Sequence, residues 1–441
     1  MFDSQKIVET VERLPHWPLA FMQDALESRT RWRELCIKYD LRGKKDFMWR
    51  YGREWKPGEP DQGWKIHISA TILSACDVLD ATVPLLKKHD ALFKVIASLD
   101  ELEKLNSGLW YGYSQIGKFI TVYPVDVEHF RTILSELAPV IPSECAAPSV
   151  PFDLSYPNAP NLFYRYGGFS GPDITDDAGR AISVIKKPDG SPTEDRRNVP
   201  VPDWMDFPFT AEAKVNEAFA DSPLTYRYRI FRSISQRGKG GVYEAIDIQT
   251  SPPNFCIVKE GRRHGETAWD GRDGSDRVRN EAKVLRELKG KVPGIPAVID
   301  EFSVNQNVYL VIEKLEGETL QRYARSHDHS LSEEEKSSIS DQIRRILDDM
   351  HAAGWVWRDC KPGNLFISPE GVVRPIDFEG ATPISSPDFL PWNTPEFAPP
   401  DLGKLSHYKN LASNLPEDHF ALDACITFLE NSAPSGSKLI K

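Results

Sequence analysis

Residues 355–380 read WVWRDCKPGNLFISPEGVVRPIDFEG, and this stretch decides the fold of the C-terminal half of the chain. Asp359, Lys361 and Asn364 stand at D-x-K-x-x-N spacing between a helical pattern and a strand pattern, and Asp377 opens D-F-E-G. Phosphoryl transfer requires a carboxylate near the acceptor hydroxyl, a cation at the transferred phosphate and oxygen ligands for Mg²⁺. The spacing therefore predicts that Asp359 and Lys361 are catalytic and that Asn364 and Asp377 bind Mg²⁺.

Residues that could hold a nucleotide precede this stretch. Lys259 ends the strand pattern CIVK, and Glu281 lies in the next helical pattern, where a Lys–Glu pair would orient the α- and β-phosphates. The turn QRGKGGVYEA at 236–245 supplies three glycines that we expect to contact the nucleotide, ATP or GTP: Gly238, Gly240 and Gly241.

These motifs occur in order over about residues 226–430, and together they resemble the protein-kinase superfamily. NTPEFAPPDL looks like the end of an activation segment, and Asp418 resembles the structural aspartate of the following buried helix. The resemblance implies a bilobal kinase-like domain with a short C-terminal lobe.

Three departures from the kinase pattern keep a degenerate kinase scaffold open as an alternative. They are Trp357 for the usual His, Glu379 for the Gly of D-F-G, and glycines spaced more closely than G-x-G-x-x-G.

The N-terminal half carries cations on predicted strands. Lys65 and His67 alternate with apolar residues in GWKIHIS, so both side chains should project from one face of a strand. Lys94, Lys118 and Arg165 lie in or beside other strand patterns. Clustered cations repel one another unless an anion lies between them, and a phosphate dianion would be such an anion. Spacing alone is also consistent with ordinary side chains that face solvent.

The blocks GWKIHIS, FKVIASL, LNSGLWYGYSQIGKFITVYP and LFYRYGGF resemble the lyase domain of class III and class IV lanthipeptide synthetases, which is similar to phosphothreonine lyases. The resemblance implies that Lys94 removes the Cα proton of a phosphorylated residue and that His67 protonates the departing phosphate. It also implies that Lys65, Lys118 and Arg165 hold that phosphate. Neighbouring cations would lower the pKa of a lysine that acts as a base.

The two resemblances together imply a dehydratase. It would phosphorylate Ser or Thr of a ribosomally made precursor peptide and then β-eliminate phosphate, giving dehydroalanine or dehydrobutyrine. The geometry of elimination, syn or anti, stays open. A second alternative is a regulatory Ser/Thr protein kinase whose N-terminal domain only binds phosphopeptides.

The fold class expected is α+β, with a lyase-like domain followed by the kinase-like domain. We place a lyase region at 1–210, made of an N-terminal extension (1–60), a core (about 61–180) and a Pro/Asp-rich linker (about 181–210). The kinase-like domain should cover 225–430, before a polar tail at 431–441. We expect Ser330 to cap the long helix before the catalytic loop, with Glu333 three residues on.

Composition narrows the possible partners. A net charge of −11 argues against nonspecific nucleic-acid binding, and no stretch approaches the length of a membrane helix. Six scattered cysteines without a CxxC pair fit a reducing cytoplasm and predict no zinc site. Because no cyclase pattern follows the kinase region, we expect no ring formation by this chain alone. Either a separate cyclase adds the rings, or this sequence is a shortened version of a longer enzyme.

Overall fold

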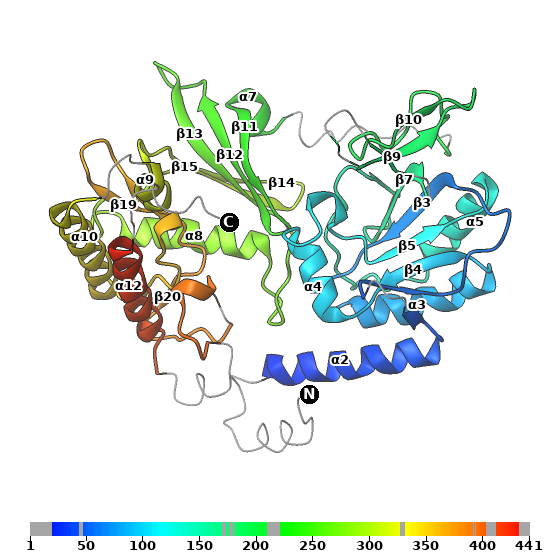
Figure 1. The fold of residues 1–441 in the computed structure, drawn as a ribbon, viewed down its shortest axis with the longest axis horizontal. Coiled ribbons are helices and arrows are strands. Elements are labelled where there is room, and N and C mark those ends of the chain that lie inside the picture. Colours follow the sequence, from blue (N-terminus) through cyan, green and yellow to red (C-terminus); the bar gives the residue numbers. More distant parts are fainter. Residues whose placement is uncertain are drawn as a thin grey trace.

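The computed structural model describes residues 20–43, 47–169, 173–175, 179, 181–209, 221–326, 331–390, 392, 394–402 and 412–431. Figure 1 shows two units side by side, an N-terminal unit coloured blue to green and a C-terminal unit coloured green to red. The expected tail, 431–441, lies outside the described residues beyond Asn431. Among the described helices, none is both long and apolar enough to cross a membrane.

A seven-stranded antiparallel sheet forms the centre of the N-terminal unit, with strand order β1-β2-β4-β5-β3-β7-β6. The strands are β1 (Arg42–Gly43), β2 (Trp49–Tyr51), β3 (Gln62–Ile68), β4 (Leu92–Ile96), β5 (Ile120–Tyr123), β6 (Leu154–Ser155) and β7 (Leu162–Gly168). The helices of this unit are α2 (Ala20–Lys38), α3 (Ala75–Lys88), α4 (Leu99–Ser107) and α5 (Val127–Leu137).

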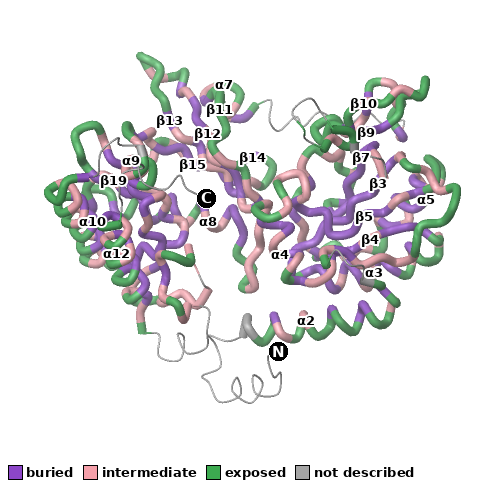
Figure 2. The backbone as a smooth tube through the Cα atoms, in the orientation of Figure 1, coloured by how far each residue is buried: buried purple, intermediate pink, exposed green. Residues whose placement is uncertain are grey.

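Alternation along β3 positions the candidate lyase residues. Ile66 and Ile68 enter a core that also contains Leu79 of α3 and Phe130 of α5. The opposite face of β3 is buried too, which Figure 2 shows as continuous purple along the central strands. A sheet buried on both faces cannot leave its charged side chains in solvent, so their charges need partners.

Two stretches assigned to an extension and a linker belong to the folded N-terminal unit. β1 and β2, from within the expected extension, add two strands to the edge of the sheet. Within the expected linker, β9 (Ala181–Lys186) and β10 (Pro192–Glu194) pair with each other, and β9 also pairs with β8 (Asp173–Thr175). Pro and Asp on either side of AISVIK obscured this strand in the sequence.

The C-terminal unit has a five-stranded antiparallel sheet with order β11-β12-β13-β15-β14 beside a helical lobe. The sheet consists of β11 (Tyr228–Gln236), β12 (Gly240–Asp247), β13 (Asn254–Gly261), β14 (Val298–Val304) and β15 (Asn307–Glu313). The main helices are α8 (Gly274–Leu288), α9 (Leu320–Ser326), α10 (Glu333–Ala352) and α12 (Leu415–Glu430). Short strands around the catalytic loop are β16 (Glu318–Thr319), β17 (Trp355–Val356), β18 (Leu365–Ile367), β19 (Val373–Pro375) and β20 (Thr382–Pro383).

Helix α10 starts two residues later than expected. Ser332, not Ser330, is its N-cap, and a capping box joins Ser332 to Glu335. Ser330 lies outside the described residues. The local sequence repeats Ser and Glu at the same spacing, so either pair satisfies the capping pattern.

The two units meet where the β11–β12 turn and the loop before α8 reach α4. The backbone N–H of Gly238 donates to the carbonyl of Ser107 at 2.9 Å. Trp269, in the loop before α8, packs against the core of the N-terminal unit, and the guanidinium of Arg29 lies 5.0 Å from its ring centroid. The kinase-like sheet is thus tied directly to the lyase-like unit.

Candidate active sites

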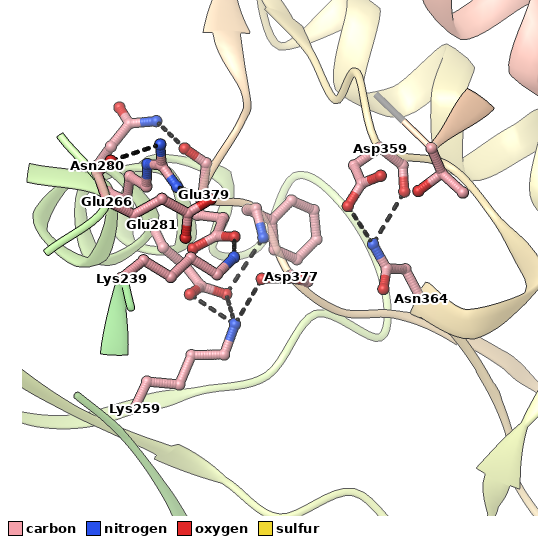
Figure 3. A network of polar contacts seen from close by, with 12 residues as sticks. Lys239, Lys259, Glu266, Asn280, Glu281, Asp359, Asn364, Asp377 and Glu379 are labelled. Atoms are coloured by element: carbon pink, nitrogen blue, oxygen red, sulfur yellow. Dashed lines mark hydrogen bonds and ion pairs between the residues drawn. The ribbon is translucent and has the colours of Figure 1, made fainter. Parts of the chain in front are cut away.

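The predicted nucleotide residues of the C-terminal unit converge. Lys259 of β13 donates to both carboxylate oxygens of Glu281 on α8 at 2.7 Å and to Oδ1 of Asp377 at 2.8 Å (Figure 3). Burial would raise the pKa of Asp377, but the ammonium groups of Lys259 and Lys239 hold it well below its usual range. Asp377 is therefore ionised, as a cation ligand must be.

The catalytic loop forms a second network. Lys361 Nζ lies 2.9 Å from both carboxylate oxygens of Asp359 and 3.0 Å from Oγ1 of Thr394. The amide nitrogen of Asn364 donates to the carboxylate and the backbone carbonyl of Asp359. Burial raises the pKa of Asp359, which suits a group that accepts a proton from a hydroxyl. Thr394, in the segment after D-F-E-G, was not predicted.

The donor set fits Mg²⁺. Asn364 uses its amide nitrogen toward Asp359, so its side-chain oxygen is the atom that would ligate a cation beside the Asp377 carboxylate. Hard oxygen ligands of this kind, completed by phosphate oxygens, are typical of Mg²⁺ sites. Within the described ranges, no group of three or more His, Cys, Asp or Glu side chains is placed to hold a metal.

Trp357 maintains the contacts that tie the catalytic loop to D-F-E-G. Its indole Nε1 donates to the carbonyl of Asp377 at 2.9 Å, and its ring stacks on Phe378 with centroids 5.4 Å apart. The Asp418 carboxylate accepts from the backbone N–H groups of Trp357 and Arg358 at 2.8 and 2.7 Å. The structural role predicted for Asp418 is therefore present, and the substitution at 357 leaves the loop connected.

Asp388 is a functional candidate that sequence reasoning missed. Its carboxylate accepts from Arg358 of the catalytic loop at 2.9 Å and from two nitrogens of Arg272 at 2.8 Å each. Arg358 also pairs with Glu417 at 2.9 Å. These contacts fix the segment after D-F-E-G against the catalytic loop and the loop before α8.

The three predicted glycines lie at the turn between β11 and β12. Gly238 has no room for a side chain, because a Cβ atom there would lie 1.6 Å from the carbonyl oxygen of Asn106. Gly240 and Gly241 begin β12 and pair with Gly261 and Glu260 of β13. The turn thus lies next to the end of β13, the strand that carries Lys259.

In the N-terminal unit, strand register places four predicted residues on one face of the sheet. Thr121 of β5 lies opposite both His67 of β3 and Lys94 of β4, so the three side chains form one row. In the neighbouring row Lys65 lies opposite Arg165 of β7. The alternation predicted for Lys65 and His67 is confirmed.

Three of the predicted cations, Lys65, Lys118 and Arg165, are buried. Lys65 is 6% exposed, Lys118 3% and Arg165 1%. Arg165 Nη2 donates to Asp195 at 2.7 Å, whereas its buried Nε and Nη1 have no hydrogen-bond partner among the described residues. These cations are therefore not ordinary side chains that face solvent. A buried guanidinium donor requires a hydrogen-bond acceptor. An anion that binds here would supply one.

Electrostatics supports an anion at this position. The pKa of Lys65 is lowered to about 7: burial is the largest effect, Asp195 opposes it, and the charge of Arg165 acts in the same direction as burial. Burial likewise lowers the pKa of Lys118 to about 8, with Asp153 opposing. The positive charge of Arg197 also lowers the pKa of both lysines. A bound dianion would restore the charged form of each lysine.

Three residues of this cluster, Asp153, Asp195 and Arg197, were not predicted. Asp153 contacts His67 Nδ1 in a short hydrogen bond, and Asp195 binds Arg165 and the Gly168 N–H. They precede β6 or follow β10, in Pro-rich or linker-like sequence. Such sequence has neither strand nor helix periodicity, so no pattern predicted these three residues.

Lys94 lies on the same face with a different environment. Its ammonium lies 4.2 Å from the ring centroid of Trp49 on β2, and Tyr51 of β2 lies opposite it in the register. Cation–π contact of this kind orients an ammonium group. The strand from the expected extension therefore shapes the surroundings of the predicted base.

Comparison with known proteins gives two matches in succession. Residues 32–221 match the family described as RamC, N-terminal domain, and residues 228–422 match the protein kinase domain family. The chain is 30% identical over 356 residues to a probable SapB synthase of Streptomyces coelicolor, a match that covers 78% of this chain and 38% of that protein.

Serine/threonine-protein kinases are among the other relatives. Serine/threonine-protein kinase F of Synechocystis is 30% identical over 193 residues, 38% of this chain and 39% of that protein. PknA of Mycobacterium tuberculosis is 35% identical over 165 residues, 35% of each chain. This chain thus spans less than two fifths of each relative's length. It joins a RamC-type N-terminal domain to a protein kinase domain, the arrangement implied by its resemblance to class III and class IV lanthipeptide synthetases.

Proposed function

We propose that this protein dehydrates Ser and Thr residues of a ribosomally made precursor peptide in two steps, phosphorylation at the C-terminal unit and β-elimination at the N-terminal unit. The observation that carries the proposal is Arg165. Its buried Nε and Nη1 are without a partner among described residues, beside Lys65 and Lys118. A phosphate group fits the need for a strong, multivalent acceptor there.

In the first step, Asp359 accepts the proton of the peptide hydroxyl as the hydroxyl oxygen attacks the terminal phosphorus. The bond between that phosphorus and the bridging oxygen breaks, and the nucleoside diphosphate leaves. Lys361, held between Asp359 and Thr394, offsets the charge of the transferred phosphoryl group. Asn364 and Asp377 would hold Mg²⁺, and Lys259 and Glu281 would orient the phosphates of ATP or GTP. Mg²⁺ neutralises phosphate charge when it is bound.

In the second step, neutral Lys94 removes the Cα proton of the phosphorylated residue. The electron pair of that C–H bond forms the Cα=Cβ bond, and the Cβ–O bond breaks to release phosphate. Lys65, Lys118 and Arg165 bind the phosphate and stabilise its developing charge. His67 donates a proton to the leaving oxygen.

The proton on His67 depends on the substrate. Burial, the largest effect, lowers the pKa of His67 to about 3 although Asp153 opposes it, so the imidazole is neutral without phosphate. A phosphate dianion favours the imidazolium, because opposite charge nearby stabilises the charged form. Phosphate binding would therefore load His67 with the proton that it later donates.

Mass spectrometry of a candidate precursor peptide tests the proposal, with enzyme, Mg²⁺ and nucleotide. We expect wild type to remove water, Lys94→Ala to accumulate phosphopeptide, and Asp359→Asn to leave the peptide unmodified. Lys88→Ala serves as a matched control, because Lys88 is exposed and pairs with Glu136 in the same unit.

A synthetic phosphoserine version of the peptide tests the second step alone. Elimination from this peptide by Asp359→Asn but not by Lys94→Ala would assign the two steps to the two units. Phosphopeptide that accumulates with wild type as well would overturn the lyase step and leave a kinase with a phosphopeptide-binding domain.

A further inference from the structure

Lys239 lies at the tip of the β11–β12 turn and has no role in the function proposed above. Its ammonium forms an ion pair with Glu379, the residue that replaces glycine in D-F-E-G (Figure 3). The Glu379 side chain is buried, and the Lys239 side chain is half-buried. The pair bridges the glycine turn and the loop that carries Asp377.

The backbone around Lys239 is fixed on three sides. Its carbonyl accepts from the Arg262 N–H at 2.8 Å, and the neighbouring Gly238 N–H donates to Ser107 at 2.9 Å. Gly274, at the start of α8, approaches so closely that a Cβ atom there would lie 1.7 Å from the Lys239 carbonyl oxygen. The backbone of Lys239 is therefore fixed beside the D-F-E-G loop, and only a rotation of the side chain could bring its ammonium group to another partner.

The charge of Lys239 acts on the metal-binding carboxylate. After Lys259, Lys239 is the second cation that keeps the pKa of Asp377 low. Burial, the largest effect, lowers the pKa of Lys239, and Arg277 and Lys259 act in the same direction, while Asp377 and Glu266 oppose the shift. Lys239 contacts Glu379, two residues after Asp377, so its ammonium group lies beside the loop that would hold Mg²⁺ and is placed to contact nucleotide phosphates.

We propose that Lys239 binds the phosphate chain of a nucleoside triphosphate and that Glu379 holds its ammonium group when no nucleotide is present. This inference rests on the proposed kinase activity of the C-terminal unit. On binding, Lys239 exchanges a carboxylate partner for phosphate oxygens, both charge-assisted acceptors. The lysine thereby adds a phosphate contact that closely spaced glycines do not supply.

Another role would produce the same ion pair. Lys239 and Glu379 could simply fasten the glycine turn to the D-F-E-G loop. The two roles predict different effects of Glu379→Gln on the affinity for a nucleoside triphosphate. If the pair is only a fastening, Lys239→Met and Glu379→Gln break the same contact and should have equal effects.

Calorimetry with Mg²⁺ and a non-hydrolysable triphosphate analogue tests the proposal on the full chain. We expect Lys239→Met to weaken binding about 10- to 100-fold, the loss of one hydrogen bond to a charged group. Lys239→Arg should retain most of the affinity, and Glu379→Gln should match or exceed wild type, because it frees Lys239 and removes a negative charge. The corresponding nucleoside, which lacks phosphates, should bind Lys239→Met and wild type equally.

Unchanged triphosphate binding by Lys239→Met, or equal losses in Lys239→Met and Glu379→Gln, would overturn the phosphate role. Thermal unfolding of each variant ensures that a loss of affinity is not a loss of fold, and Lys239→Arg provides a second readout if Lys239→Met unfolds. Absence of nucleotide binding by wild type would instead overturn the kinase proposal on which this one rests.

Discussion

His67 depends on a single carboxylate for its orientation. Its Nδ1 contacts Asp153, and because an ionised carboxylate can only accept, Nδ1 of the neutral ring carries the hydrogen and Nε2 carries none. Oδ1 of Asp153 is buried without a hydrogen-bond partner among the described residues. Asp153 therefore retains an acceptor that can stabilise an imidazolium, the form that the proposed elimination requires.

Asp153→Asn keeps the shape of the side chain and removes its charge. We expect elimination from a phosphoserine peptide to slow by about 100-fold or more, because the imidazolium loses its counter-ion and the ring can adopt the other tautomer. Release of inorganic phosphate measures the effect. Phosphorylation of the unmodified peptide should proceed at the wild-type rate, and an unchanged elimination rate would remove Asp153 from the site.

The pKa of Lys65 predicts a pH dependence for the proposed phosphate site. Its pKa of about 7, like that of about 8 for Lys118, lies below the ordinary value of lysine. Each ammonium is charged below its pKa and neutral above it, whereas phosphate is already a dianion above pH ~7. Affinity for phosphopeptide should therefore fall as pH rises from 7 to 9.

Titration calorimetry of a phosphopeptide with a Lys94→Ala background, which prevents turnover, measures this dependence. Lys65→Arg keeps its charge over the whole range and should show a shallower decline in affinity. An affinity that rises with pH, or one that does not change, would contradict the charge states assigned to the two lysines.

At the scale of elements, the segment after D-F-E-G is held by a carboxylate in place of a phosphate. In protein kinases, phosphorylation of the activation loop orders the segment through new contacts to arginine. Here Asp388 already supplies a negative charge to Arg272 and Arg358. The ordered segment brings Thr394 to Lys361 without a modification.

Asp388→Asn should slow phosphorylation of the precursor peptide by about 10-fold or more, because two arginines lose a charged partner. Elimination from a synthetic phosphopeptide should not change. Asp341→Asn is a suitable control, since Asp341 is exposed on α10 and its ion pair is 3.6 Å long. Phosphatase treatment of wild type should leave the rate unaltered; a marked loss would indicate that a phosphate orders the segment after all.

The periodicity of the sequence predicted most strands and helices. It did not predict the charged side chains in the irregular segments that follow them. The patterns around Lys65, Lys94 and Arg165 are regular, so β3, β4 and β7 were expected and the register then aligned their side chains. Asp195 and Asp388 lie in irregular sequence, and their partners are 30 and 116 residues away. Tertiary contacts of that kind leave no periodic trace.

On the scale of the whole molecule, the two units share an apolar contact as well as hydrogen bonds. Trp269 of the kinase domain packs on the core of the N-terminal unit, and the Arg262 guanidinium lies 5.0 Å from the ring centroid of Tyr113. An interface with a partly buried aromatic side chain couples the stabilities of the two units. Sequence patterns predicted both domains but not this contact.

Trp269→Ala should weaken the coupling. We expect a loss of about 1–3 kcal/mol, less than for a fully buried Trp, and a wider separation of two unfolding transitions in differential scanning calorimetry. Trp110→Ala is the matched control, because Trp110 is 71% exposed. Identical thermograms for wild type and Trp269→Ala would show that the units unfold independently of this contact.

The hydrogen bond from Gly238 to Ser107 limits how such enzymes can be recombined. A chimaera that joins this N-terminal unit to a foreign kinase would place another glycine turn against the end of α4. Any residue larger than glycine at position 238 would collide with the Asn106 carbonyl and lift the turn. Donor kinases for grafting should therefore be chosen by the residue at this single position, ahead of overall sequence identity.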